Sequence, residues 1–181
     1  MNLLDRPHQL DRDKHECKAI IETPKGGRNK FDFDPDYGAF TIATVLSEGF
    51  SFPFDFGFIP STLADDGDPT DVMLLMDAPA FPGCVVDVRL IGVLEAMQSE
   101  EDGKENRNDR LLAVATVSKQ HADVRTLDDL GEELLKQIEQ FFVFYNKTRG
   151  REFRVLARRG PKDAVKIIEQ HADRFQSEHS M

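Results

Sequence analysis

Residues 50–59 read Phe-Ser-Phe-Pro-Phe-Asp-Phe-Gly-Phe-Ile, with a phenylalanine at every second position from Phe50 to Phe58. Successive side chains of a β-strand point to opposite faces, so this period of two predicts a strand with all five rings on one face. Pro53 and Gly57 lie between the rings, and both residues are typical of an edge strand or a bend. We therefore expect a bent or edge strand whose aromatic face packs on the core.

Short apolar runs surround this segment from Lys18 to about Ser118, and glycine and proline interrupt them. They lie at residues 19–21, 40–46, 72–76, 84–97 and 111–117. This length and spacing indicate several strands of a compact β structure. The polar stretch Glu100–Asp109 is expected to be a loop between two of these strands.

The apolar period changes after Thr126. Apolar residues then recur at intervals of three and four, which predicts an amphipathic helix from Leu127 to Tyr145. A short apolar piece follows at Phe153–Leu156, and Gly160-Pro161 is expected to open a last helix that reaches Phe175. Strands followed by helices indicate the α+β class, with a barrel or strongly curved sheet packed by two helices.

The chain of 181 residues has the length of one domain, which we place at residues 17–181 after a polar N-terminal extension at residues 1–16. That extension either folds over the body or stays mobile. The formal charge of −10 opposes a general role in binding nucleic acid or a membrane surface. Carboxylates that first bind divalent metal are the exception, because the metal reverses the local sign of the charge.

The lack of a recognisable targeting signal and the small number of cysteines favour a cytoplasmic protein. The N-terminal residues lack the apolar stretch of a signal peptide, and no run approaches the length of a membrane span. Cys17 and Cys84 are the only cysteines, which is too few for a disulfide framework and typical of a reducing compartment.

The densest chemical feature is Asp65-Asp66-Gly67-Asp68-Pro69-Thr70-Asp71. Four carboxylates in seven residues repel one another unless a cation neutralises them or water screens them. The oxygens of Asp66, Asp68 and Asp71 could converge on a hard cation such as Mg²⁺. The alternative is a solvated turn, since aspartate, glycine and proline are common turn residues.

Two further places could bind phosphate. Gly26-Gly27, flanked by Glu22, Lys30 and Asp32, is either a phosphate cradle or a hairpin turn. Basic residues at positions 147, 149 and 151 follow Tyr145, and they are either a phosphate grip or cations placed at a helix C-terminus. The scattered histidines give no support to nucleophilic catalysis.

Several ordered motifs resemble the soluble family I inorganic pyrophosphatases over about Ile20 to Lys147. Residues 66–71 match the D-G-D-P-x-D motif of that family. Residues 21–24 and 30–32 resemble its I-E-I-P and K-Y-E pieces, and residues 52–59 resemble its Y-P-x-N-Y-G-Y-I strand. The segment 83–94 and Phe141-Phe142-x-x-Tyr145 follow in the order that the family requires.

The resemblance implies Mg²⁺-dependent hydrolysis of inorganic pyrophosphate to two phosphates, with several Mg²⁺ ions, on a small closed OB-like β-barrel with two C-terminal helices. It also implies a homo-oligomer, since bacterial members of the family are commonly hexamers. By resemblance, Asp68 is the catalytic base that accepts the proton of the attacking water. The substrate-binding residues would be Lys30, Arg110, Tyr145 and Lys147. The metal ligands would be Glu22, Asp32, Asp66, Asp71, Asp102 and Asp109.

Several positions depart from the family pattern. The family's arginine falls on Thr44, two of its tyrosines on Phe52 and Phe56, and a lysine on Asn146. This chain carries an insertion near residues 100–110. One metal-binding aspartate of the family therefore falls on Asn108, unless a shift of one residue aligns it with Asp109. A second family aspartate, earlier in the same segment, falls on Glu100 or Asp102. The departures leave two alternatives open: a catalytically weakened relative that binds metal and a phosphorylated ligand, or a hydrolase of another diphosphate.

Overall fold

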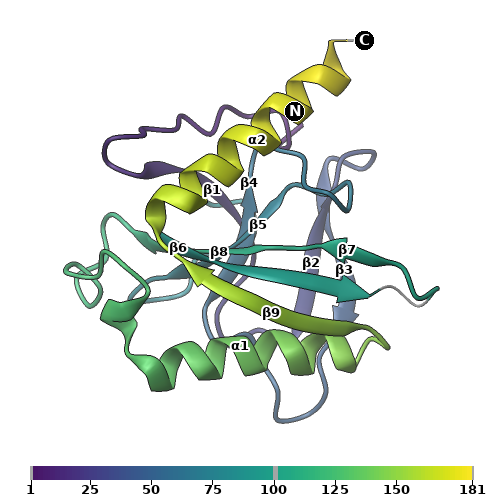
Figure 1. The fold of residues 1–181 in the computed structure, drawn as a ribbon. Helices are drawn as coiled ribbons and strands as arrows, with labels where there is room; N and C mark the ends of the chain where they lie inside the picture. Colours follow the sequence, from purple (N-terminus) through teal and green to yellow (C-terminus); the bar gives the residue numbers. More distant parts are fainter. Residues whose placement is uncertain (1, 100–101, 181) are drawn as a thin grey trace.

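The computed structural model describes residues 2–99 and 102–180, in which most strands precede the helices and one strand separates the two α-helices (Figure 1). The main sheet contains β1 (Glu16–Thr23), β4 (Asp55–Ile59), β5 (Thr70–Leu75), β8 (Arg110–Ala115), β6 (Val85–Ser99), β7 (Glu105–Arg107) and β9 (Glu152–Arg159). Its order is β1-β4-β5-β8-β6-β7, and β9 pairs with β6. Because β1 also pairs with β6, the strands close into a ring. The predicted α+β class is confirmed, and the ring is compatible with the expected OB-like barrel.

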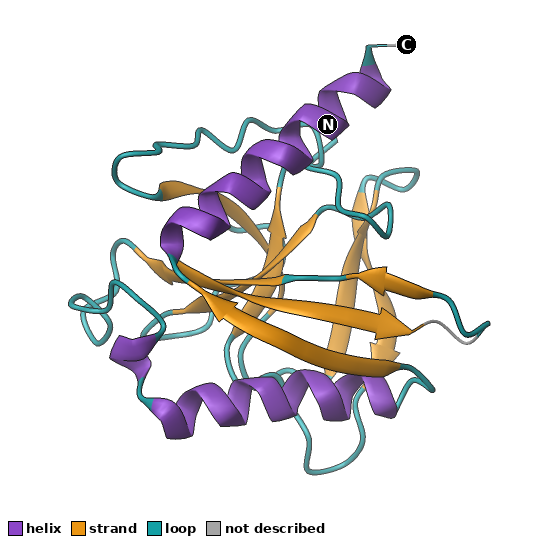
Figure 2. Ribbon diagram, viewed as in Figure 1, coloured by secondary structure: helices purple, strands orange, loops and turns teal. Residues whose placement is uncertain are grey.

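A separate hairpin and two helices complete the fold (Figure 2). The hairpin consists of β2 (Asn29–Asp34) and β3 (Ala39–Val45), and the helices are α1 (Glu132–Lys147) and α2 (Pro161–His179). One hydrophobic cluster joins the sheet to α1, and a second joins it to α2, so the helices cover different parts of the sheet. Within the described residues, neither helix is long and apolar enough to cross a membrane.

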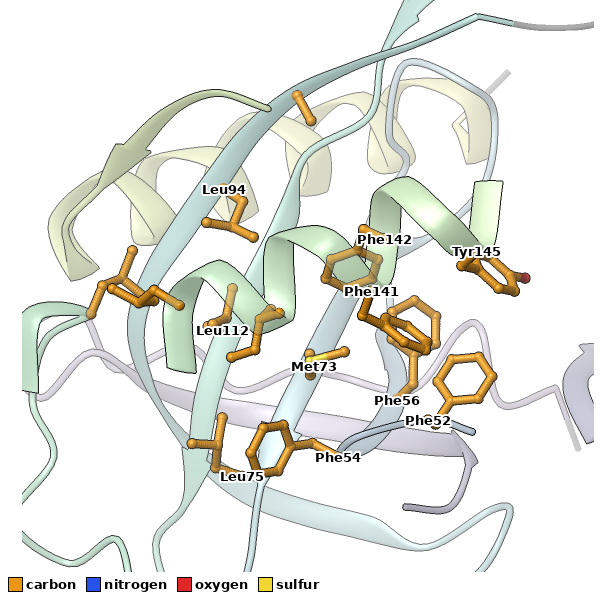
Figure 3. Close-up of a cluster of buried hydrophobic side chains, with 14 of the residues drawn as sticks. Phe52, Phe54, Phe56, Met73, Leu75, Leu94, Leu112, Phe141, Phe142 and Tyr145 are labelled. Carbon is orange, nitrogen blue, oxygen red and sulfur yellow. The ribbon is translucent and has the colours of Figure 1, made fainter. Parts of the chain in front are cut away.

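The phenylalanine segment differs from its prediction. Only residues 55–59 form a strand, and this strand lies between β1 and β5 rather than at an edge. Gly57 is needed because the backbone of Ile20 approaches so closely that a Cβ at position 57 would lie 1.9 Å from the Ile20 carbonyl oxygen. Phe52 and Phe54 precede the strand and pack with Phe141 and other residues of one aromatic core (Figure 3). Most of the predicted aromatic face is therefore core, although three of its five phenylalanines precede the strand.

The structure also differs from the prediction at the start of the first helix and in the loop before Asp109. The helix predicted from Leu127 begins at Glu132, because Gly131 has a φ of 79° and a ψ of 151°, which no helix contains. Residues 128–130 form a separate 3₁₀ turn. The predicted loop before Asp109 holds the short strand β7, whose residues 105–107 pair with 97–99 of β6, and Glu100 lies outside the described residues.

The N-terminal segment contacts the body at several of its described residues. Leu3 and Leu4 pack on a cluster that contains Phe33 and Phe58. The Ser61 amide donates to the Leu4 carbonyl at 2.7 Å, and the Lys18 amide donates to the His8 carbonyl at 2.7 Å. Of the two alternatives left open by the sequence, the described residues adopt the folded one.

Candidate active site

A cavity of about 620 Å³ lies where the hairpin β2–β3, the β4–β5 connection, the start of β8 and the end of α1 meet. Polar and charged side chains dominate its wall. Eight of the predicted site residues line it: Glu22, Lys30, Asp32, Asp66, Asp68, Asp71, Arg110 and Tyr145. Side chains from widely separated segments of the chain thus share one cavity.

The acidic segment is a tightly closed loop between β4 and β5. The Thr62 hydroxyl donates to the Ile59 carbonyl at 2.6 Å and accepts from the Thr70 amide at 2.9 Å, which joins the two ends of the loop. Gly67 has a φ of 88°, a conformation that side-chain-bearing residues rarely adopt. The Asp68 amide donates to an Asp66 carboxylate oxygen at 3.1 Å. These bonds fix the loop that carries the carboxylates.

Helix α2 holds the same loop from outside the cavity. The backbone carbonyl of His171 accepts a hydrogen bond from the Leu63 amide at 3.0 Å, and its ring Nδ1 lies 2.7 Å from the Thr70 hydroxyl. Arg174 forms an ion pair of 2.6 Å with Asp65, the one aspartate of the acidic segment that does not line the cavity. Contacts from a second element therefore anchor both ends of the acidic loop.

The acidic loop gives its cavity-facing carboxylates an unfavourable environment for negative charge. Burial raises the pKa of Asp68 and of Asp71 above the ordinary value. Repulsion from Asp71 and Asp32 raises the pKa of Asp68 further, whereas Arg110 and Lys30 partly offset the effect of burial on Asp71. The pKa of Asp66 is also raised, again chiefly by burial. A cation placed among these groups would relieve both the repulsion and the loss of solvation.

Glu22 and Lys30 form a buried ion pair at the base of the cavity. Lys30 Nζ donates to Glu22 Oε2 at 3.3 Å and also pairs with Asp32, while the Phe33 amide donates to Glu22 Oε1 at 3.1 Å. Burial raises the pKa of Glu22 to about 7 despite the neighbouring lysine. For Lys30 the effect of burial, which lowers the pKa, is outweighed by Glu22 and Asp32, so its pKa is raised and the ammonium stays charged.

Arg110 is the buried cation beside the acidic loop. Its Nη1 pairs with Asp71 and with the Asn108 side-chain oxygen. The guanidinium lies 5.6 Å from the centroid of the Phe142 ring and 5.5 Å from that of Phe153. Its Nε is buried without a hydrogen-bond partner in the described structure. The rings and Asp71 thus hold a permanent positive charge at the cavity wall.

The final turn of α1 forms another wall. Tyr145 is buried, with its ring 5.9 Å from Phe141 and 5.7 Å from Phe52, and its hydroxyl accepts a hydrogen bond from Arg149 Nη1 at 2.8 Å. The buried Asn146 amide donates to the Phe142 carbonyl of its own helix at 2.9 Å. Arg149 and Arg151 complete this wall.

Three predicted site residues lie away from the cavity wall. Asn108 and Arg110 line the cavity, while Asp109, which lies between them just before β8, does not. Asp109 instead accepts a hydrogen bond from the Ala96 amide at 2.9 Å. Asp102 is exposed and pairs with Lys104 at 3.2 Å, and Lys147 lines a different groove between α1 and β9. Their roles stay predictions.

Two polar residues of the cavity wall were not identified from the sequence. Gln98 of β6 and Asn106 of β7 are register partners, and both line the cavity. The Asn108 amide donates to the Gln98 side-chain oxygen at 3.2 Å. Gln98 directly follows the apolar run 84–97, but nothing in that position marks it as a site residue, and only the pairing of β6 with β7 brings Asn106 beside it at this wall.

Comparisons with known proteins agree on one family. A family model for inorganic pyrophosphatase matches residues 19–176. An inorganic pyrophosphatase from Synechocystis is 37% identical over 84% of this chain and 87% of its own length. One from Geobacillus stearothermophilus is 36% identical over 87% and 93%. The crystal structure of inorganic pyrophosphatase from Thermus thermophilus superposes with a TM-score of 0.85 at 31% identity, covering 97% of this chain and 99% of that one.

Proposed function

Because this chain belongs to the soluble family I inorganic pyrophosphatases, we propose that it hydrolyses inorganic pyrophosphate to two phosphates in the cavity described above. The chain is an inorganic diphosphatase, a hydrolase that cleaves a phosphoanhydride bond. One observation carries the assignment to this cavity: the carboxylates of the acidic loop and the ammonium of Lys30 line the same space. A phosphoanhydride needs both, since its oxygens bind cations and its hydrolysis needs a proton acceptor near the attacking water.

We propose Mg²⁺ as the cofactor, in several ions held by Glu22, Asp32, Asp66 and Asp71. Carboxylate oxygens are the donors that Mg²⁺ prefers, and the burial that raises the pKa of Asp66 and of Asp71 leaves negative charges that a divalent cation would compensate. As placed, no three acidic, histidine or cysteine side chains of the described residues enclose a metal ion, since Asp71 and Asp32 turn to Arg110 and Lys30. When bound, the metal would polarise water and phosphate oxygens.

Asp68 is proposed as the base that accepts a proton from the attacking water. It lies at the exposed mouth of the cavity, and its neighbours Asp66 and Gly67 hold it in a fixed turn. Partial burial and the charges of Asp71 and Asp32 raise its pKa, which makes the carboxylate a stronger proton acceptor than a solvated aspartate.

Cations of the chain then hold the phosphate groups. Lys30 stays protonated because Glu22 and Asp32 surround it, so it supplies a permanent charge for the phosphate that is attacked. Arg110 neutralises Asp71 and brings a second fixed charge to the same wall. The Tyr145 hydroxyl is proposed to donate a hydrogen bond to the phosphate that leaves.

We also propose a homo-oligomer, a hexamer by family resemblance, in the cytoplasm. Large apolar side chains exposed on the isolated chain support association: Tyr37, Ile42, Val45 and Phe81 are each more than half exposed. Light scattering coupled to size-exclusion chromatography tests this proposal, and a monomer at micromolar concentration would contradict it.

The function is tested by phosphate release from pyrophosphate, with and without Mg²⁺, in the wild type and in Asp68→Asn. We expect release that needs metal and falls at least about a hundredfold in the variant, since a positioned base contributes that much. Asp65→Asn is the matched control, because this aspartate belongs to the same loop but pairs with Arg174 outside the cavity. Unchanged release in Asp68→Asn would refute the assigned base.

A second substrate class is favoured by one observation. Apolar side chains of Leu4, Phe33 and Phe58 line part of the cavity, and an organic group attached to a diphosphate could contact them. A panel of nucleoside and other organic diphosphates beside pyrophosphate tests this candidate. Preference for pyrophosphate would exclude it, while binding of pyrophosphate without any turnover would indicate a weakened relative.

A further inference from the structure

The α1 wall of the cavity lacks most of the donors that the family pattern places there. Phe52 and Phe56 carry no hydroxyl, and the amide of Asn146 is committed to the Phe142 carbonyl. Thr44 lies on β3 and does not line the cavity. A phosphate at this wall must therefore be held by other groups of the chain, and Tyr145 and Arg149 are side by side there.

Tyr145 has a fixed position from which it can act as a donor. Its ring lies nearly parallel to that of Phe141, with an interplanar angle of 11°, and Phe52 contacts it from another side. Figure 3 shows its hydroxyl oxygen pointing away from the packed rings. Since this oxygen accepts the hydrogen bond of Arg149 Nη1, its own proton is left to bind an acceptor in the cavity.

Arg149 is held by the same contact. Its guanidinium carbon lies 5.3 Å from the centroid of the Tyr145 ring, and one N–H group donates to the hydroxyl at 2.8 Å. The planar guanidinium carries several further N–H groups, which suit the oxygens of a phosphate. The ring and hydroxyl of Tyr145 thus orient an exposed cation whose remaining donors are available at the cavity mouth.

The backbone turn around Arg149 reduces the unfavourable effect of the helix C-terminus on a bound anion. The C-terminus of a helix is the negative end of its dipole and disfavours an anion. Here the Asn146 carbonyl accepts hydrogen bonds from the amides of Arg149 and Arg151, at 2.9 and 3.0 Å. Gly150, with a φ of 73°, allows this reversal of the chain. The turn therefore satisfies a helix carbonyl and brings two arginines to the wall.

We propose that Arg149, oriented by Tyr145, binds the phosphate group of pyrophosphate that leaves, in place of the donors missing from this wall. This inference rests on the proposed function, and it assigns a binding residue that the family motifs do not contain. Arg149 acts on substrate affinity: it contacts the departing phosphate and leaves proton transfer at Asp68 unchanged.

The test measures binding of methylenediphosphonate, a non-hydrolysable analogue, with Mg²⁺ by titration calorimetry. We expect Arg149→Gln to raise its Kd about tenfold or more, the usual effect of a lost charge-assisted hydrogen bond, and Arg149→Lys to recover part of the loss. Arg154→Gln is the matched control, since it removes the same charge from an exposed arginine of β9 that lies outside the cavity. A Kd in Arg149→Gln within about twofold of that in Arg154→Gln would overturn the inference.

A double-mutant cycle with Tyr145→Phe tests the orienting contact. Because the two side chains share one hydrogen bond, we expect the combined loss of affinity to be smaller than the product of the two single losses. Independent effects would contradict a joint role.

Phosphate release by the wild type separates the two claims: release with unchanged analogue binding in Arg149→Gln defeats only the inference, while weakened binding without any wild-type release defeats only the proposed function.

Discussion

The acidic loop and the α1 wall face the same cavity but are built in different ways. The loop is closed by Thr62 and Thr70 and is held by His171 and Arg174 from outside. The α1 wall depends on one helical turn, and its cations Arg149 and Arg151 reach the cavity from beyond the end of the helix. Carboxylates that bind metal or accept a proton require fixed geometry, whereas a phosphate accepts positive charge from many directions. The difference explains how the chain keeps its carboxylates and yet tolerates Phe52, Phe56 and Asn146 at the other wall.

The largest effect is expected from Asp71→Asn at the acidic loop. Asp71 is a proposed metal ligand and the partner of Arg110, so the substitution removes a ligand and leaves a buried guanidinium without its counter-charge. We expect phosphate release to fall at least about a hundredfold at fixed Mg²⁺ and to recover partly at high Mg²⁺. A metal titration of phosphate release measures this effect.

Asp77→Asn is the control for that substitution. Asp77 follows the other end of β5 and accepts hydrogen bonds from Ser118, Lys119 and Gln120, away from the cavity. Loss of the Asp77 carboxylate should lower the thermal stability of the protein without lowering the rate of phosphate release per folded molecule. Equal loss of release in both variants would mean that the acidic loop has no special role.

An intermediate effect is expected from a pair of glycine substitutions that compares the two walls directly. Gly67 and Gly150 have φ values of 88° and 73°, so alanine at either position costs about 1–2 kcal/mol of backbone strain. We expect a similar fall in Tm for the two variants. Gly67→Ala should lower kcat because it disturbs Asp66 and Asp68, and Gly150→Ala should raise KM because it disturbs Arg149. Steady-state kinetics would contradict the comparison if both variants changed the same parameter.

The smallest effect concerns pH and the anchoring of the acidic loop. Burial, with help from Arg174, lowers the pKa of His171 below its ordinary value, so the neutral ring is the form that the fold favours. A group with a lowered pKa in the folded state stabilises the fold above its unfolded pKa of about 6.5 and loses that contribution as the pH falls. We expect Tm to fall less between pH 7 and pH 5 in His171→Gln than in the wild type. Parallel curves of Tm against pH for the wild type and His171→Gln would exclude a contribution of His171 to the pH dependence of stability.

The sequence predicted the acidic half of the site better than the rest, for a physical reason. Asp66, Asp68 and Asp71 lie within one short loop, and their repulsion is visible in the sequence itself. Gln98, Asn106 and Arg110 reach the same cavity only because β6, β7 and β8 pair in a particular register. The choice between Asn108 and Asp109 depends on that pairing as well, since the Asn108 amide donates to the Ala96 carbonyl of β6 and the Asp109 carboxylate accepts from the Ala96 amide.

The errors in the fold have similar causes. The alternation of phenylalanines is the same whether a strand lies at an edge or in the centre, and the role of Gly57 depends on the approach of β1, which is distant in sequence. Leu127 shares the apolar spacing of α1 and is buried in the same cluster, but Gly131 separates it from the helix. Periodicity identified which residues are buried more reliably than the element that each belongs to.

The most direct test of the account compares Asp68→Asn and Arg149→Gln in one set of steady-state kinetics with magnesium pyrophosphate. If one wall performs the chemistry and the other holds the phosphate, Asp68→Asn lowers kcat with little change in KM. Arg149→Gln then raises KM with little change in kcat. The account is contradicted if Arg149→Gln leaves KM unchanged or if Asp68→Asn retains the wild-type kcat.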